Sequence, residues 1–222
     1  MKKLLFIVLC CITAKMQAAI VINEFDSDTS GVDALEFVEL FGDPNMSLDG
    51  LSIVGVNGSD DLTYDSFAFD LDGFSTNSDG LFLIGNAAVA GADIVFSGNG
   101  LQNGPDAIVL FTGNISDYPN DTAPPTGAML VDVVHYGTND SADPGLSALY
   151  PSASYIDEGD LGDKDTDSIG RSVDGAGSFV VFDTPTPGAL NAAAVPEPSS
   201  VACLTLLGCG AVYRRVRRKK VA

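Results

Sequence analysis

Acidic side chains that could bind a hard cation are most concentrated between residues 157 and 168. Calcium takes about six to eight oxygen ligands, and acids at alternate positions can converge on one ion when the backbone loops around it. Asp163, Asp165 and Asp167 alternate in this way, and Asp174 falls where such a loop would end. These four aspartates are the candidate metal ligands, with calcium as the candidate cofactor.

The segment departs from the helix-loop-helix calcium site at two positions. Ser168 stands where the turn glycine belongs, and Asp174 replaces the bidentate glutamate. No neighbouring stretch has the apolar period of a helix. Two interpretations stay open, an irregular calcium loop and a solvated acidic loop.

Nucleophilic catalysis finds little support in the residue types present. His135 is the one histidine, and no nucleophile motif accompanies it, so it is interpreted as a structural strand residue. Cysteines occur only near the two ends, at Cys10, Cys11, Cys203 and Cys209, so the middle of the chain offers no thiolate and no disulfide framework. We therefore predict that the protein is not an enzyme.

Paired carboxylates could in principle hydrolyse a glycoside, and Glu24, Glu36 and Glu39 would approach one another if their strands paired. With 30 acidic residues in the chain, however, close pairs arise by chance, and tryptophan, the usual sugar-stacking residue, is absent. A solvated sheet face is the simpler interpretation of these three glutamates.

The charge of the chain is strongly segregated. Acidic residues number 30 against 11 basic ones, and nine of the basic residues lie in the first 15 and last nine positions. Residues 19–198 hold all 30 acids and only Lys164 and Arg171, a formal charge of −28. Phosphate groups are bound by lysine and arginine, so nucleic acids and anionic membrane surfaces are excluded as partners of this region.

The N-terminus has the pattern of a secretory signal peptide. Lys2 and Lys3 precede an apolar run over residues 4–13, and small residues surround Ala18. We predict cleavage after Ala18, which places the following region in an exported protein.

The middle of the chain consists of short apolar stretches separated by Gly, Asn, Asp and Pro, which is typical of an all-β domain. The predicted strands are residues 19–25, 35–41, 51–56, 66–71, 81–85, 93–96, 107–112, 129–136 and 178–182. In the strand over residues 35–41, Val38 and Leu40 share one face while Phe37, Glu39 and Phe41 share the other, which predicts a half-buried antiparallel strand. A long insertion over residues 137–177 predicts surface loops with one short helix near residues 145–149. Together these features favour an immunoglobulin-like β-sandwich.

An ordered set of motifs extends over residues 20–191. Its members are Val21-Ile22-Asn23-Glu24-Phe25, Glu36-Phe37-Val38-Glu39-Leu40, Leu48-Asp49-Gly50-Leu51, Ile108-Val109-Leu110-Phe111, Val131-Asp132-Val133-Val134-His135-Tyr136-Gly137, Ser168-Ile169-Gly170-Arg171-Ser172 and Thr186-Pro187-Gly188-Ala189-Leu190-Asn191. In this order they resemble the bacterial lamin-tail domain (LTD). The resemblance implies a sandwich with a strand at residues 168–171, and the chain departs from a minimal domain by insertions at 58–79 and 137–167.

The C-terminus combines Pro196-Glu197-Pro198, an apolar run over residues 201–213 and a basic tail over residues 214–220. This combination resembles the PEP-CTERM sorting signal of exopolysaccharide-producing Gram-negative bacteria. The apolar run is short for a membrane helix of about 20 residues, which favours a transient transmembrane helix in the inner membrane; an ordinary tail anchor is the alternative. The resemblance implies that an exosortase-type transpeptidase recognises Pro196, Glu197 and Pro198.

The sequence thus predicts a signal peptide at residues 1–18, a lamin-tail-like domain at 19–192 and a sorting signal at 193–222. The predicted function is that of a non-catalytic surface or extracellular-matrix module of the cell envelope, with exopolysaccharide or envelope proteins as partners. Two alternatives are a secreted hydrolase acting on polysaccharide or phosphoester, and an adhesive module that pairs through an edge strand.

Overall fold

The computed structural model describes residues 19–191, which belong to one compact unit. The predicted cleavage site at Ala18, the Pro-Glu-Pro motif at 196–198 and the predicted transmembrane segment at 201–213 therefore lie outside the described residues. Within residues 19–191, no helix is both long enough and apolar enough to cross a membrane.

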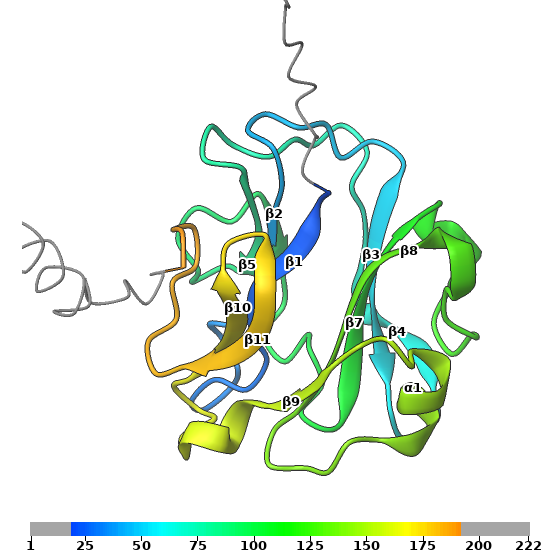
Figure 1. The fold of residues 1–222 in the computed structure, drawn as a ribbon, viewed down its shortest axis with the longest axis vertical. Coiled ribbons are helices and arrows are strands. Elements are labelled where there is room, and N and C mark those ends of the chain that lie inside the picture. The colour runs from blue at the N-terminus through cyan, green and yellow to red at the C-terminus, as the bar shows by residue number, and fades with distance from the viewer. Residues whose placement is uncertain (1–18, 192–222) are drawn as a thin grey trace, which may run out of the picture. The chain divides into compact units, whose positions relative to one another are not determined.

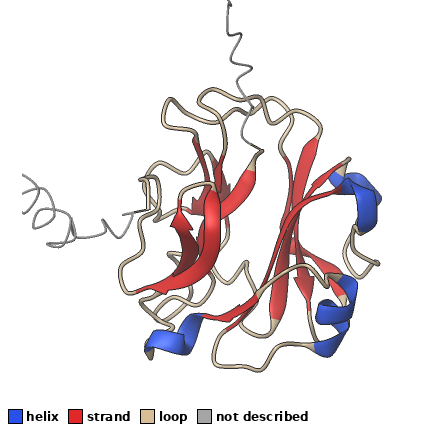
Figure 2. Ribbon diagram, viewed as in Figure 1, coloured by secondary structure: helices blue, strands red, loops and turns tan. Residues whose placement is uncertain are grey.

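Two β-sheets make up most of this unit (Figures 1 and 2). The first sheet has six strands, in the order β11 (Ala176–Phe182), β10 (Ser168–Val173), β1 (Val21–Asp26), β2 (Phe37–Phe41), β5 (Leu81–Asn86) and β6 (Ile94–Phe96). The second has five, in the order β4 (Leu62–Asp70), β3 (Leu51–Asn57), β7 (Asp106–Thr112), β8 (Leu130–Gly137) and β9 (Tyr155–Asp157). The helical elements are short: η1 (Ile115–Asp117), η2 (Gly127–Met129), α1 (Pro144–Leu149) and η3 (Glu158–Leu161).

Neighbouring strands pair antiparallel except β5 with β6 and β8 with β9, which run parallel. Each of the nine predicted strand segments overlaps an observed strand, and the predicted short helix is α1, so the all-β prediction is confirmed. The alternating pattern did not predict β9, and β10 was expected only from the family resemblance. β4 begins at Leu62, four residues before the predicted start at residue 66.

The main apolar core lies between the two sheets and draws on both. Phe25 of β1 meets Tyr136 of β8 edge to face, with ring centroids 5.2 Å apart. A second cluster covers the outer face of the second sheet, where Leu146 of α1 and Tyr150 pack on Val54 and Val109. The fold is therefore a β-sandwich whose second sheet has apolar side chains packed on both of its faces.

The outer face of the first sheet is also covered, which contradicts the prediction of a half-buried strand over residues 35–41. Phe37 of β2 packs with Leu83 and Val89 on that face, and Glu39 beside it has no exposed surface. The covering comes from the segment that follows β5 and from residues 183–191. Both faces of β2 are therefore buried, although its sequence alternates as in a strand with one solvated face.

Candidate functional site: a network of buried carboxylates

Nine carboxylates in the described part of the chain are buried, whereas that part contains only two basic residues, Lys164 and Arg171. They are Glu24, Asp26, Asp28, Asp33, Glu36, Glu39, Asp106, Glu158 and Asp167. A buried carboxylate is costly unless hydrogen bonds or opposite charge compensate for its lost hydration. The partners of these groups therefore show what the network does.

Glu24 and Glu39 face each other across β1 and β2, where they are direct cross-strand partners. Both are fully buried, and so is Glu36 just before β2. The interpretation of these glutamates as a solvated sheet face is therefore wrong. Glu24 and Glu39 contact a segment about 150 residues further along the chain, and Glu36 contacts a loop about 65 residues further along, which their own strand pattern does not reveal.

Glu24 binds that distant segment through both carboxylate oxygens. Its Oε1 accepts hydrogen bonds from the backbone N–H of Thr186, at 2.8 Å, and from the hydroxyl of Ser168, at 2.7 Å. Its Oε2 accepts the hydroxyl of Thr186. Because burial outweighs these hydrogen bonds, the pKa of Glu24 is raised above its ordinary value.

Glu39 holds the next part of the same segment. Its Oε2 accepts the backbone N–H of Gly188 at 2.8 Å, and its Oε1 accepts the side-chain amide of Asn23 at 3.1 Å. Burial raises the pKa of Glu39 to about 8, and the nearby charges of Glu24 and Asp174 act in the same direction. At neutral pH this site therefore favours the protonated carboxyl.

Asn191 completes the attachment of the segment. Its backbone N–H donates to Asp174 at 2.9 Å, and its side-chain amide donates to the backbone carbonyl of Arg171 at 2.9 Å. Asp174 also accepts the amide of Asn23 at 3.0 Å. We call Asn23, Glu24, Glu39, Asp174, Thr186, Gly188 and Asn191 the clasp, because together they fix residues 183–191 onto the outer face of the first sheet.

Glu36, the residue just before β2, performs a similar task for a different loop. Its two oxygens accept the backbone N–H groups of Gly100 and Leu101, both at 2.9 Å, and Oε2 also accepts the amide of Asn86 at 3.3 Å. Burial raises the pKa of Glu36 to about 7. Glu36 therefore fixes the loop that leads from β6 towards β7.

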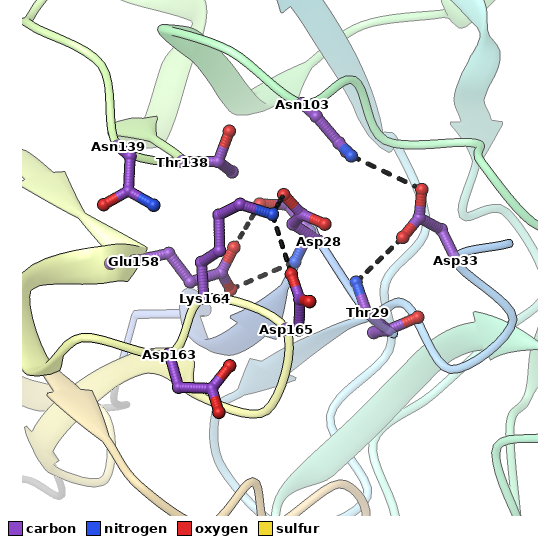
Figure 3. A network of polar contacts seen from close by, with 12 residues as sticks. Asp28, Thr29, Asp33, Asn103, Thr138, Asn139, Glu158, Asp163, Lys164 and Asp165 are labelled. Atoms are coloured by element: carbon purple, nitrogen blue, oxygen red, sulfur yellow. Dashed lines mark hydrogen bonds and ion pairs between the residues drawn. The ribbon is translucent and has the colours of Figure 1, made fainter. Parts of the chain in front are cut away.

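A second polar group connects the end of β1 to the insertion between β8 and β10 (Figure 3). Glu158, the first residue of η3, accepts the backbone N–H of Ser27 at 3.1 Å and its hydroxyl at 2.7 Å. Lys164 forms an ion pair with the buried Asp28 and a second one with Asp165. Lys164 therefore supplies the positive charge of this polar group. Glu158 is the buried acceptor of the hydrogen bonds from Ser27.

The four predicted calcium ligands lie at different places. The backbone carbonyl of Asp163 accepts the N–H groups of Thr166 and Asp167 in a tight turn, and Asp165 is paired with Lys164. Asp174 belongs to the clasp, and the six residues of β10 separate it from Asp167 by about 20 Å. The structure thus does not bring the four together, and no three Asp, Glu, His or Cys side chains within residues 19–191 are arranged to hold a metal ion.

His135 lies on β8, where it is nearly fully buried. Its Nε2 accepts the backbone N–H of Asp143 at 3.3 Å, and its ring meets that of Tyr155 edge to face. Burial lowers the pKa of His135, which favours the neutral ring that this acceptor role requires. These contacts give the histidine a role in holding the start of α1.

Sequence reasoning missed the partners of the carboxylates, above all Asn23, Ser27 and Thr186. The sequence did contain a signal for part of this network, because five of its residues belong to the motifs quoted above: Asn23, Glu24, Thr186, Gly188 and Asn191. No protein-family model, no curated protein and no solved structure matches the chain.

Proposed function

We propose that the chain is an exported, non-catalytic module of the cell surface or extracellular matrix, built on an immunoglobulin-like, lamin-tail-like sandwich. The observation that carries this proposal is the clasp. Residues from the first, second and last motifs, at Glu24, Glu39 and Thr186, meet in one hydrogen-bonded network that closes the domain. The closure of the domain by these motif residues supports the proposal of a stable binding or structural module.

The position of the glutamates argues against the hydrolase alternative. A retaining or inverting glycosidase needs two carboxylates that both reach the sugar. Glu24 and Glu39 are the closest pair suggested by the sequence, but residues 183–191 cover them and their oxygens already accept hydrogen bonds. A substrate would have to displace this segment before it could meet either group.

The remaining support comes from the chain ends and the charge. The signal-peptide pattern before Ala18 and the Pro196-Glu197-Pro198 motif favour export, transient anchoring in the inner membrane and transfer by an exosortase-type transpeptidase. The charge of −28 over residues 19–198 keeps such a module soluble and favours neutral polysaccharides, cations or basic envelope proteins as partners.

Fractionation of an exopolysaccharide-producing Gram-negative host tests the sorting route. The full-length chain should reach the surface or matrix fraction, and a variant with Pro196, Glu197 and Pro198 all changed to alanine should remain in the inner membrane. Ser199→Ala with Ser200→Ala is the matched control and should be sorted normally. Cytoplasmic retention of the unchanged chain, or normal sorting of the triple variant, would refute the proposal.

Incubation with exopolysaccharide from the same culture tests the non-catalytic role. The mature protein should sediment with the polymer, or with envelope proteins from that culture, and should release no reducing ends. Steady release of reducing ends, proportional to protein concentration, would instead establish the hydrolase.

A further inference from the structure

β11 forms one outer edge of the first sheet, and within residues 19–191 this edge has no partner strand (Figure 1). Its other side pairs with β10. η3 and β9 lie near β11, but in the described part of the chain no backbone hydrogen bond joins either of them to it. A free strand edge presents a row of unpaired N–H and C=O groups, so it is a template for pairing with another strand.

The other three sheet edges are short or covered. β6 and β9 have three residues each, which limits the ladder that either could form. β4 is longer, but the loop at residues 119–122 binds its edge, since Thr63 exchanges two backbone hydrogen bonds of 2.9 Å with that loop. β4 also carries the charges of Asp65 and Asp70. Short strands, covering loops and charged side chains are the usual protections of an edge against unwanted pairing.

β11 lacks these protections over residues 178–182. This segment reads Ser-Phe-Val-Val-Phe and contains no charge and no proline, in a region whose formal charge is −28. The irregularity in its pairing with β10 lies earlier, between Ala176 and Phe179. Phe179 and Val181 pack against the main core, while Val180 points to the outer face and is 36% exposed. The edge is therefore held in place by the core and is uncharged along its length.

The composition of this edge suits a second copy of the same strand. A two-fold axis through Val180 would place Val180 opposite its counterpart on the outer face, and Phe179 opposite Val181 on the core side. Pairs of β-branched and aromatic side chains are favourable across strands, and no like charges stand opposite one another in this register. A basic partner, in contrast, would be attracted to the acidic surfaces of the domain and not to this uncharged edge.

We propose that two copies of the chain associate through antiparallel pairing of their β11 edges, which joins their first sheets into one continuous sheet. Such a contact covers few residues and belongs to the small, reversible class of interfaces. The charge of −28 on residues 19–198 of each copy opposes their approach, and salt screens this repulsion beyond about 8 to 10 Å at physiological ionic strength. Dimerisation should therefore strengthen as salt rises. This inference does not depend on the proposed sorting route.

Sedimentation velocity of the purified full-length chain, over a series of protein concentrations, tests this interface. The unchanged chain should pass from monomer to dimer as its concentration rises, and it should do so at lower concentration in high salt. Val180→Lys places like charges opposite each other at the centre of the pair and should weaken association by about tenfold or more. Val95→Lys, at an exposed residue of β6 on the opposite edge of the same sheet, is the matched control and should leave association unchanged. Hydrogen exchange should show that backbone amides of β11 gain protection as the dimer forms.

All of the compared chains share residues 192–222, so a difference between them reports on the changed strand. If Val180→Lys does not fold, Ser178→Lys gives the same test, because a lysine at this exposed position also protects the edge. A monomer at every concentration would overturn the proposal, and so would association that persists unchanged in the lysine variant of β11. Association that weakens as salt rises would also overturn it, since that trend indicates attraction between opposite charges at another surface.

Discussion

Replacement of Glu39 by glutamine should make the stability of the domain less sensitive to pH. Glu39 is fully buried on β2, the strand between β1 and β5, and it accepts hydrogen bonds from Asn23 and Gly188. Glutamine has the shape of the protonated glutamate, so Glu39→Gln imitates the carboxyl form and removes the titration. The glutamine side chain keeps one acceptor oxygen, and an NH2 group takes the place of the other.

The direction of this pH dependence follows from the raised pKa of Glu39. A carboxyl group whose pKa is higher in the folded state binds more protons there than in the unfolded chain, so folding stability falls as pH rises. For Glu39 the loss begins near its ordinary pKa of 4.5 and is complete above its folded pKa of about 8. Each pH unit within this interval contributes about 1.4 kcal/mol, which sets an upper limit of about 5 kcal/mol for this group.

Urea unfolding of the two proteins at pH 5, 7 and 9 measures this effect. The unchanged chain should lose stability from pH 5 to pH 9, and Glu39→Gln should lose less, by up to the limit above. Asp79→Asn, a change at an exposed turn residue, is the control and should keep the full slope. A stability that rises with pH in the unchanged chain, or the same slope in Glu39→Gln, would refute the assignment of a buried, protonated carboxyl at this position.

Three further changes probe the packing. Thr186→Val removes the hydroxyl that donates to Glu24 and should lower the free energy of unfolding by about 1 to 2 kcal/mol, whereas Thr184→Val at an exposed position should change it little; urea midpoints compare the two. Phe25→Ala leaves a cavity between the sheets and should cost about 3 to 5 kcal/mol in thermal unfolding. Gly58→Ala should cost about 1 to 3 kcal/mol by the same measurement, since its added methyl group would lie 1.9 Å from a backbone carbonyl oxygen; wild-type stability would contradict that packing.

The strands were predictable where local pattern and tertiary surroundings agree. β7 and β8 are rich in valine, isoleucine and leucine, and both are interior strands of the second sheet, where such residues are favoured. β10 reads Ser-Ile-Gly-Arg-Ser-Val, a weak strand pattern, and it is a strand because β1 and β11 pair with it on either side. β9 has three residues, too few for an alternation to be recognised.

The candidate site was less predictable because its contacts join distant segments. The sequence singled out Glu24, Glu36 and Glu39 as carboxylates that might cluster, yet their burial requires loops that no local pattern places above them. Asp163 and Asp165 have suitable spacing for an ion, but spacing along the chain does not determine where side chains converge. Asp174 shows this most clearly, since it lies beyond β10 and binds Asn191.

Carboxylates suit the task of fixing loops in a domain that has no cysteine and few bases. An ionised carboxylate can accept three or more hydrogen bonds, so one glutamate can hold a backbone N–H and a hydroxyl at once, as Glu24 and Glu158 do. The cost is that each buried charge must be neutralised by a proton or by a cation.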